Sequence, residues 1–442
     1  LELLHKTPTY LRTVQNSLNR NLRLQTEPKN GEMVRTELLK AAQRYPDDTI
    51  FPEMLVWYFT QEKDFSSAFI HARSLDLRSK SVGLNIMALG NTAAANDDLE
   101  TAMECYGYVA AKGVSSPYFY TARNELLQVR FHALTKETPA NFEGLTLLEA
   151  DYAASIRDLG VKSETSIMLK NQAHILAFYL DRGDEGMAIM EEVLNIAGLN
   201  TRVAAVCKLE LGDIYVFEDL VWDASLLFSQ VILDFKDDPL GHEAKYRNAR
   251  ISYYTGDFAW AQTQLNALKA STSKLISNDA INLSLLITDN FNLDTIFEPM
   301  EMYARADLLV MQRRYGEAVS TLDTLIKNWP GHALEDEILM LKGDLALQNG
   351  EVDRAITYYQ EVADLHFDDI TGDDALYNLA VIYDVTLNDL VKAEELYEKL
   401  IFEFSGSLHV IEARKRYREL KGEEVGSIEG FENPVEESIS QP

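Results

Sequence analysis

The sequence has few of the residues that break helices or cross-link a chain. It contains 11 Pro and 22 Gly among 442 residues, which leaves few places to interrupt a helix. Its two cysteines, Cys105 and Cys207, lie roughly three units apart in the repeat described below, too far for the Cα separation of about 7 Å that a disulfide allows. We therefore expect two buried free thiols, which neither require nor forbid an oxidising compartment.

Positive charge and long apolar runs are also scarce. The chain has 41 Lys and Arg against 70 Asp and Glu, a formal charge of -29, which argues against general nucleic-acid binding because phosphate needs a positive surface. Basic or neutral proteins and peptides fit better as partners. The densest apolar stretch, "MLVWYF" from Met54, is six residues long, whereas a membrane-spanning helix needs about 20. We expect no transmembrane segment, and membrane association only through a partner or through an anchor that precedes residue 1.

Motifs for catalysis or cofactor binding are missing. There is no Gly-rich phosphate loop, "HEAKY" from His242 has Tyr246 where a zinc protease needs its second His, and "STSK" from Ser271 lacks the accompanying motifs of its enzyme class. The histidines are scattered singly, and the Asp pairs stand where helices need N-caps rather than at calcium-loop spacing. The sequence therefore predicts a protein that is not an enzyme and has no cofactor or metal.

What the chain does contain is a repeated turn followed by an amphipathic helix, as in "NGEVDRAITYYQ" from Asn349. An alanine recurs five residues after each turn position, and most intervals between these alanines are 34 to 38 residues. A small residue at this spacing marks the place where the second helix of a helix-turn-helix unit crosses the first. The predicted crossing residues are Ala68, Ala102, Ala188, Ala224, Ala261, Ala318, Ala355 and Ala393.

These units resemble tetratricopeptide repeats (TPRs). The segment "KLELGDIYVFEDLVWDASLLF" matches the family pattern at Leu211, Gly212, Tyr215, Ala224 and Phe228. The same pattern returns, with one extra residue that we assign to the turn, at Leu379, Ala380, Tyr383, Ala393 and Tyr397. The resemblance implies an all-α fold, an α-solenoid of roughly ten repeats that winds into a right-handed superhelix.

The ends of the second helices carry a narrower resemblance. Several finish in an aromatic residue followed by Pro, Asp or Ser, as at Tyr45-Pro46 and Trp329-Pro330. Such endings resemble bacterial periplasmic TPR proteins, among them the TPR lipoprotein of the outer-membrane β-barrel assembly machinery and the cell-division coordinator with TPR repeats. This implies a periplasmic or outer-membrane-associated protein, with a cytoplasmic adaptor as the alternative.

Irregularities in the repeat suggest a domain organisation. Residues 139–160 predict a longer second helix than usual, and 274–299 insert an apolar helix and a loop. We interpret this insertion as a joint between an N-terminal solenoid half, residues 1–273, and a C-terminal half, residues 300–421. The remainder, 422–442, is rich in Glu and has no Lys or Arg after Gly422, which predicts a disordered acidic tail.

The predicted site follows from the TPR resemblance, which implies that the first helix of each unit lines the concave face. There the residue eleven positions before the crossing alanine points into the groove, and the residue four positions earlier shares its face. The candidate partner-binding residues are Asp213, Tyr246, Arg250, Tyr253, Tyr303, Asp307, Met340 and Asp344. The alternative is a solvated concave wall without a ligand. The basic helix around Arg414 and Arg418 is a second docking candidate, although basic residues also suit a last helical turn.

Three functions remain open at this point. The first is a non-enzymatic protein–protein interaction scaffold or adaptor, in a bacterial cell-envelope complex for outer-membrane assembly or secretion. The second is a glycan- or peptide-binding envelope lipoprotein, which the placement of all four Trp on repeat helices makes weaker. The third is the TPR portion of a longer enzyme.

Overall fold

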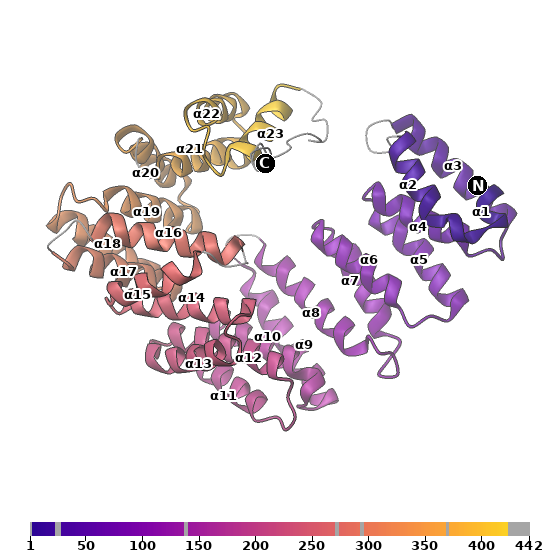
Figure 1. The fold of residues 1–442 in the computed structure, drawn as a ribbon, viewed down its shortest axis with the longest axis horizontal. Helices are drawn as coiled ribbons and strands as arrows, with labels where there is room; N and C mark the ends of the chain where they lie inside the picture. The colour runs from indigo at the N-terminus through magenta and orange to yellow at the C-terminus, as the bar shows by residue number, and fades with distance from the viewer. Residues whose placement is uncertain are drawn as a thin grey trace, which may run out of the picture. The chain divides into compact units, whose positions relative to one another are not determined.

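The computed structural model describes residues 2–22, 28–136, 140–269, 274–291, 296–367 and 371–422. These residues form α-helices joined by short turns, without a β-strand among them (Figure 1). No helix in this described part is both long and apolar enough to cross a bilayer. The α-helices are α1 Glu2–Lys6, α2 Leu11–Leu22, α3 Pro28–Arg44, α4 Ile50–Gln61, α5 Phe65–Ser79, α6 Leu84–Ala95, α7 Leu99–Ala110, α8 Phe119–Thr135, α9 Phe142–Leu159, α10 Ser166–Tyr179, α11 Gly183–Leu194, α12 Thr201–Phe217, α13 Val221–Asp234, α14 Pro239–Tyr254, α15 Phe258–Leu268, α16 Lys274–Phe291, α17 Glu298–Met311, α18 Tyr315–Asn328, α19 Glu335–Gln348, α20 Val352–Leu365, α21 Gly372–Val381, α22 Leu390–Glu403 and α23 Val410–Leu420.

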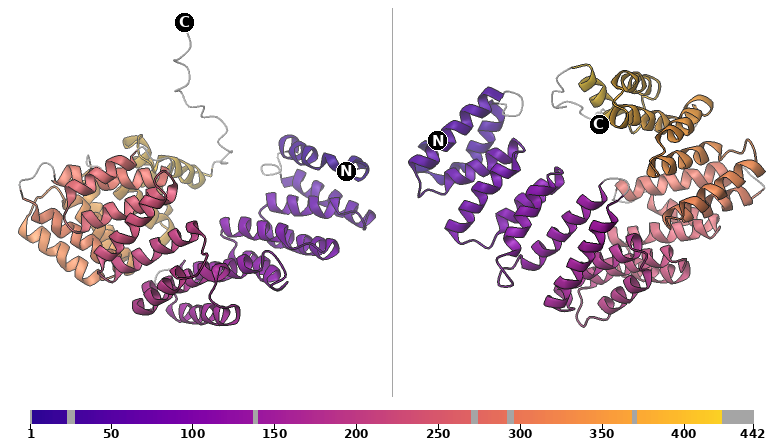
Figure 2. Two further views of the ribbon diagram at one scale, coloured as in Figure 1. Left: turned by 60° about the horizontal axis from the view of Figure 1, so that its bottom comes forward. Right: turned by 180° about the vertical axis from the view of Figure 1, so that it is seen from behind.

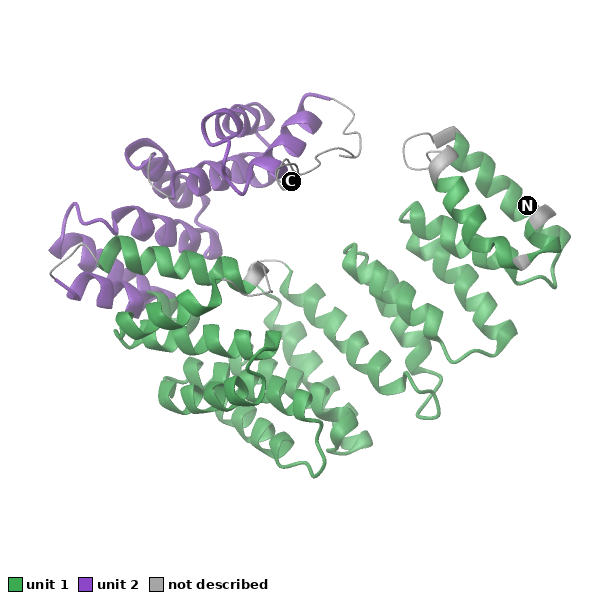
Figure 3. Ribbon diagram, viewed as in Figure 1, with its two compact units in different colours: residues 1–294, 307–314 green, residues 295–306, 315–442 purple. Residues whose placement is uncertain are grey.

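The chain divides into two compact units (Figure 3). Unit 1 comprises Leu1–Asp294 and Asp307–Arg314, and unit 2 comprises Thr295–Ala306 and Tyr315–Pro442. Helix α17 therefore starts in unit 2, and its last residues belong to unit 1. The inserted helix α16 is part of unit 1, where it packs on α14 and α15. The predicted tail lies, apart from Gly422, outside the described residues.

Within unit 1, consecutive helices pair across short turns, and each pair contacts the next (Figure 2). The paired helices run from α4–α5 to α14–α15, and α9, with 18 residues, is the predicted long second helix. In unit 2 the pairs α19–α20 and α21–α22 repeat this arrangement, and α23 packs on α22. Buried cores are continuous between adjacent pairs, as in the cluster that joins Ala355 and Tyr359 to Leu379 and Ala393. The structure is an all-α solenoid of helical repeats.

The crossing positions bear out the predicted repeat register in all units but one. Seven of the eight predicted alanines have no exposed surface: Ala68, Ala102, Ala224, Ala261, Ala318, Ala355 and Ala393. The prediction of Ala188 as a crossing residue is wrong, because this side chain is exposed. In that unit the crossing residue is Gly186, where an added Cβ would lie 3.0 Å from the carbonyl oxygen of Ala173 on the partner helix α10. The helices approach too closely there for a side chain to fit without movement.

The backbone conformation of the turn residue explains why the motif recurs although its amino acids differ between repeats. In every one of these units, the residue five positions before the crossing residue has a positive φ angle: Lys63, Asp97, Asp181, Asp219, Gly256, Arg313, Gly350 and Asn388. Gly and Asn adopt this left-handed conformation at little cost, which is why "TGDF" and "NGEV" look alike. An Asp often follows and caps the second helix, as Asp257 does by accepting a hydrogen bond from the Trp260 backbone N–H at 3.1 Å.

The extra residue in the last full repeat lies in the first helix, not in the turn as expected from the sequence. After α21 the chain continues as a π-helical turn, Ile382–Thr386, with a hydrogen bond of 3.0 Å from the Leu387 N–H to the Ile382 carbonyl. One additional residue per turn is what a π-helix accommodates. The turn residue Asn388 keeps its place five positions before Ala393.

Candidate functional site

A groove with a volume of about 460 Å³ crosses the first helices of three successive repeats in unit 1. Its lining side chains come from helices α10, α12, α14 and α16, from the end of α17 and from the residue Arg313 just beyond it. We call this cavity the central groove. Its lining residues are His174, Phe178, Tyr179, Asp213, Glu243, Tyr246, Arg247, Arg250, Asp279, Met311 and Arg313.

Helix α14 supplies four of these side chains from one face. Glu243, Tyr246, Arg247 and Arg250 are spaced at i, i+3, i+4 and i+7, so they lie above one another along the helix. The adjacent face of α14, about a quarter of a turn around the helix, carries Ala244 and Ile251, which are buried in the repeat core. Burial of the apolar face thus fixes the direction in which the charged face points.

The part of the groove near Arg313 is formed by a segment that contacts residues more than ninety positions earlier in the chain. Gln312, which is 5% exposed, donates a hydrogen bond of 3.1 Å from Nε2 to the Val216 carbonyl at the end of α12. Leu308 joins the core cluster of the α12–α14 repeats. A simple solenoid has contacts only between neighbouring repeats, so this fold-back segment, residues 307–314, is a departure from it, and the segment contributes Met311 and Arg313 to the lining of the central groove.

Within the groove, one arginine holds two carboxylates. Arg247 lies 3.2 Å from Asp213 (Nε to Oδ1) and 3.3 Å from Glu243 (Nη2 to Oε1). Burial raises the pKa of Asp213 to about 6, and the neighbouring carboxylates of Glu210 and Glu243 add to this against the opposing effect of Arg247. The carboxyl group of Asp213 therefore changes its protonation state near pH 6.

The other two arginines lie on tyrosine rings instead of carboxylates. The Arg250 guanidinium is 5.3 Å from the centre of the Tyr254 ring and donates a hydrogen bond to its hydroxyl. The Arg313 guanidinium lies 4.1 Å from the centre of the Tyr179 ring. Asp307 is close enough to Arg250 for its charge to matter: burial raises the pKa of Asp307, and Arg250 counteracts this.

Three of the residues predicted from the sequence line the central groove, namely Asp213, Tyr246 and Arg250, and Asp307 lies beside it. Tyr253 was wrongly placed in the groove. It has no exposed surface, because the helical turn directs it into the core beside Phe258, with ring centres 6.0 Å apart. The unpredicted lining residues include Glu243 and Arg247, which the helical spacing on α14 could have identified.

The remaining predicted residues belong to unit 2 and have packing roles there. Tyr303 is largely buried, at 8% exposure, and Met340 packs against the core cluster of the α19–α22 repeats. Asp344 accepts a hydrogen bond of 2.5 Å from the hydroxyl of Tyr359. These three side chains are engaged within unit 2 and are not part of the central groove.

A smaller polar pocket of about 170 Å³ adjoins the groove and shares His174 with it. Here Glu210 is 3.0 Å from Lys170 Nζ and 2.8 Å from His174 Nδ1. Burial alone would raise the pKa of Glu210, but hydrogen bonds and charge from His174 and Lys170 hold it at about 2. This carboxylate stays ionised and holds the Lys170 ammonium group and the His174 ring in place.

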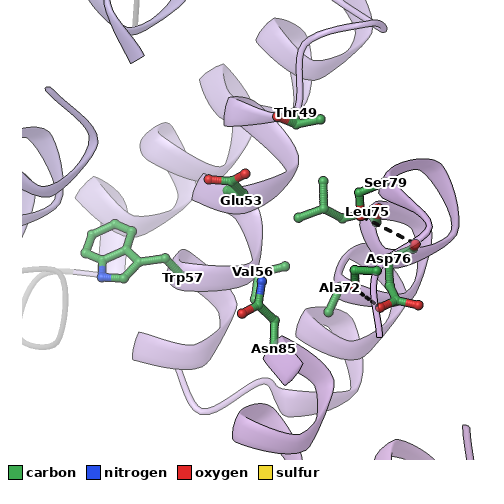
Figure 4. A pocket seen from close by; sticks show the side chains of 10 residues that line it. Thr49, Glu53, Val56, Trp57, Ala72, Leu75, Asp76, Ser79 and Asn85 are labelled. Carbon is green, nitrogen blue, oxygen red and sulfur yellow. Dashed lines mark hydrogen bonds between the residues drawn. The ribbon is translucent and has the colours of Figure 1, made fainter. Parts of the chain in front are cut away.

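A third cavity, of about 490 Å³, lies in the N-terminal part of unit 1 between α4, α5 and the start of α6 (Figure 4). Glu53 and Trp57 are one turn apart on α4, and Asp76 lies on α5. Asp76 is held by Lys112 Nζ at 2.5 Å and by the Tyr108 hydroxyl at 2.8 Å. Nothing in the sequence pattern singled out this cavity.

Residues 303–370 match the family model described as tetratricopeptide repeat, which identifies this segment as repeats of that family. Among solved structures, the chain is similar to a tetratricopeptide repeat protein from Parabacteroides merdae ATCC 43184, with 12% identity and a TM-score of 0.34 over 66% of this chain and 97% of that one. It is also similar to the TPR domain of P58(IPK), with 14% identity and a TM-score of 0.24 over 85% and 98% of the two chains. A search of curated proteins finds no match.

Proposed function

We propose that this protein is a non-enzymatic scaffold or adaptor that holds a segment of a partner protein in the central groove. The observation that carries the proposal is the groove itself: aromatic, Met and charged side chains from α10, α12, α14, α16 and the fold-back segment meet around one cavity. Aromatic and arginine side chains dominate protein-binding hot spots because they combine large contact area with directional hydrogen bonds. Tetratricopeptide repeats suggest an interaction scaffold in general, and the central groove is the binding site that we propose for it.

The test is a quantitative pulldown with two groove variants, Arg250→Glu and Asp307→Lys, and a control variant, Arg73→Glu, on the exposed face of α5. We expect both groove variants to recover less of the bound proteins, and the control to recover the wild-type amounts. Circular dichroism melts identify any variant that is unfolded. Equal recovery by all four proteins would place the interaction outside the groove, and deletion of α23 would then test the basic terminal helix.

We also propose that the scaffold works in a bacterial cell-envelope complex, in the periplasm or at the outer membrane. The support is the aromatic-Pro, aromatic-Asp and aromatic-Ser helix endings, which resemble those of periplasmic TPR proteins. The test is fractionation of cells that express the full reading frame with a C-terminal tag. Recovery in the cytoplasmic fraction would instead favour a cytoplasmic adaptor.

A further inference from the structure

The cavity between α4, α5 and the start of α6 has the dimensions of a ligand site of its own, and we call it the N-terminal cavity. Its volume of about 490 Å³ falls within the range of small-molecule sites. It shares no lining residue with the central groove. The proposed function therefore leaves this cavity without a role.

The charges around the N-terminal cavity differ from those of the central groove. Its described lining includes two carboxylates, Glu53 and Asp76, but no Lys, Arg or His. Asp76 is already engaged, because Lys112 Nζ lies 2.5 Å from its carboxylate and the Tyr108 hydroxyl donates a hydrogen bond of 2.8 Å to it. Glu53 is left as the one lining carboxylate whose charge is not balanced.

Glu53 is half-buried and has no bonding partner among the described residues. Its carboxylate accepts no hydrogen bond and forms no ion pair there. Burial, and then the charge of Asp48, raise the pKa of Glu53. A half-buried carboxylate in this situation is stabilised by any cation that reaches it.

The neighbouring polar groups of the lining can also act as acceptors. Thr49 stands at the N-cap of α4, but its side chain makes no capping hydrogen bond. The Ser79 hydroxyl donates its proton to the Leu75 carbonyl at 2.9 Å, which leaves the lone pairs of its oxygen for a donor. Asn85 adds an amide oxygen. An ammonium group has three donors and no acceptor, so it matches this set of groups.

The rest of the lining is apolar or aromatic. Trp57 follows Glu53 by one turn of α4, so the indole and the carboxylate lie on the same side of the helix. In Figure 4, Val56 on α4 lies across the cavity from Leu75 on α5. An indole face attracts organic cations, and the aliphatic side chains suit a hydrocarbon chain.

We infer that the N-terminal cavity binds a small alkylammonium ion. The ammonium group lies on the Glu53 carboxylate and the Trp57 indole, and the alkyl chain packs on Val56 and Leu75. A neutral alcohol of the same size loses the charge interaction, and a carboxylate is repelled by Glu53. The formal charge of -29 on the whole chain also favours the approach of a cation.

The experiment is a ligand-observed NMR titration of the purified full chain, without divalent cations and at about 0.15 M salt, where distant charges are screened. The probes share one hydrocarbon chain: n-hexylamine, which is protonated at pH 7 like a Lys side chain, 1-hexanol and hexanoate. We expect hexylamine to bind about tenfold more tightly than hexanol, the contribution of a charge-assisted hydrogen bond, and hexanoate to bind more weakly than hexanol. The tripeptide Gly-Lys-Gly, blocked at both ends, should bind no more tightly than hexylamine.

Variants connect this preference to the two side chains on α4. Glu53→Gln should weaken binding of hexylamine by about tenfold and leave binding of hexanol unchanged. It should melt no lower than wild type, because the carboxylate has no described partner to lose. Trp57→Leu should weaken binding of hexylamine by about threefold, the usual value of an exposed cation–π contact. The matched control is Glu104→Gln, an exposed carboxylate on α7 outside the cavity, which should leave every affinity unchanged.

Four results would each overturn the inference: equal binding of hexylamine and hexanol, tighter binding of hexanoate, no binding by any probe, or wild-type affinity of Glu53→Gln for hexylamine. Tighter binding of the Lys tripeptide would also overturn it, because the occupant would then be a lysine of another protein and not a small amine. The comparison of the three hexyl probes on wild type stands even if a variant fails to fold, which circular dichroism melts detect.

Discussion

The same repeat position has opposite uses in the two units. Asp213 and Asp344 both stand eleven residues before a crossing alanine, and both follow a glycine. In unit 2, Asp344 accepts a hydrogen bond of 2.5 Å from Tyr359, the aromatic residue of its own second helix. In unit 1 the corresponding aromatic is Phe228, which has no hydroxyl, and Asp213 instead pairs with Arg247 across the central groove. The aspartate thus bonds within its own repeat where the aromatic residue has a hydroxyl group, and pairs with an arginine of the groove where it has none.

This pairing recurs elsewhere in unit 1. Tyr106, four residues after the crossing residue Ala102, donates a hydrogen bond of 2.7 Å to Asn91, eleven residues before it. In the repeats that contribute Arg250 and Asp307, the residues four after the crossing alanine are Leu265 and Leu322, which offer no hydroxyl. In these two repeats no hydroxyl of the second helix can hold the polar residue eleven positions before the crossing alanine, as Tyr106 and Tyr359 do in theirs.

The glycine next to each of these aspartates provides the strongest test that both repeats share one geometry. A Cβ added at Gly212 would lie 2.2 Å from Phe228 Cε1, and one at Gly343 would lie 2.5 Å from Tyr359 Cε1. Both rings are fully buried and cannot move aside. We expect Gly212→Ala and Gly343→Ala each to lower the free energy of unfolding by about 3 kcal/mol, at the upper end for overpacking, as measured by urea denaturation.

The control for these variants is Gly107→Ala in α7, where an added Cβ meets no atom within 4 Å. It should stabilise by about 0.5 to 1 kcal/mol, the usual helix preference for Ala over Gly. If Gly212→Ala were as harmless as the control, the close approach of α12 and α13 at Phe228 would be wrong.

Tyr359→Phe removes the hydroxyl that distinguishes the two units. Asp344 then loses its donor, and we expect the free energy of unfolding to fall by about 1 kcal/mol, the net value of one such hydrogen bond. The hydrogen bond from Tyr359 also opposes the effect of burial, which raises the pKa of Asp344, so the pKa should rise further in the variant. Denaturation and NMR titration measure the two effects. An unchanged pKa would show that the hydroxyl does not reach the carboxylate in solution.

How far the sequence predicts this fold can be judged at particular residues. The alanine period predicted the crossing points because a side chain larger than Ala cannot fit between closely packed helices, and seven positions are fully buried. It failed at Ala188 because the glycine in "RGDE" looked like a turn residue. The turn residue there is Asp181, with a φ angle of +53°.

The site was only partly predictable, for a different reason. Local spacing identified Asp213, Tyr246 and Arg250, since burial of the apolar residues of a helix fixes the direction in which its polar residues point. The fold-back contact of Gln312 with the Val216 carbonyl joins segments more than ninety residues apart and has no periodic signal. Arg313 and Met311 could not be assigned to the groove without it.

Asp213 should make the stability of unit 1 depend on pH. Burial raises its folded-state pKa to about 6, above the usual Asp value, so between these values the folded protein binds more protons than the unfolded one. Stability from this group therefore falls as pH rises through 6. We expect the free energy of unfolding of the wild type to fall by about 1 kcal/mol between pH 5 and pH 7.5 because of this group. In Asp213→Asn this part of the decrease should be absent. Parallel pH profiles for the two proteins would exclude Asp213 as the source.

Phe228→Tyr gives the repeat of Asp213 the aromatic hydroxyl that Tyr359 supplies in the repeat of Asp344. It has the smallest expected effect on stability. The rings of Phe228 and Tyr359 lie alike against their glycines, with Cζ 2.7 and 2.8 Å from the added Cβ, so the new hydroxyl should reach Asp213 as Tyr359 reaches Asp344. A donated hydrogen bond favours the ionised carboxylate, so the pKa of Asp213 should fall and the pH dependence of stability should shrink. Burial of an extra hydroxyl offsets the new bond, so the net change at pH 7.5 should stay below about 1 kcal/mol. Urea denaturation at pH 5 and pH 7.5 measures the pH dependence of the free energy of unfolding. A dependence as large as in wild type would mean that a tyrosine at this position does not form a hydrogen bond with the aspartate of the groove.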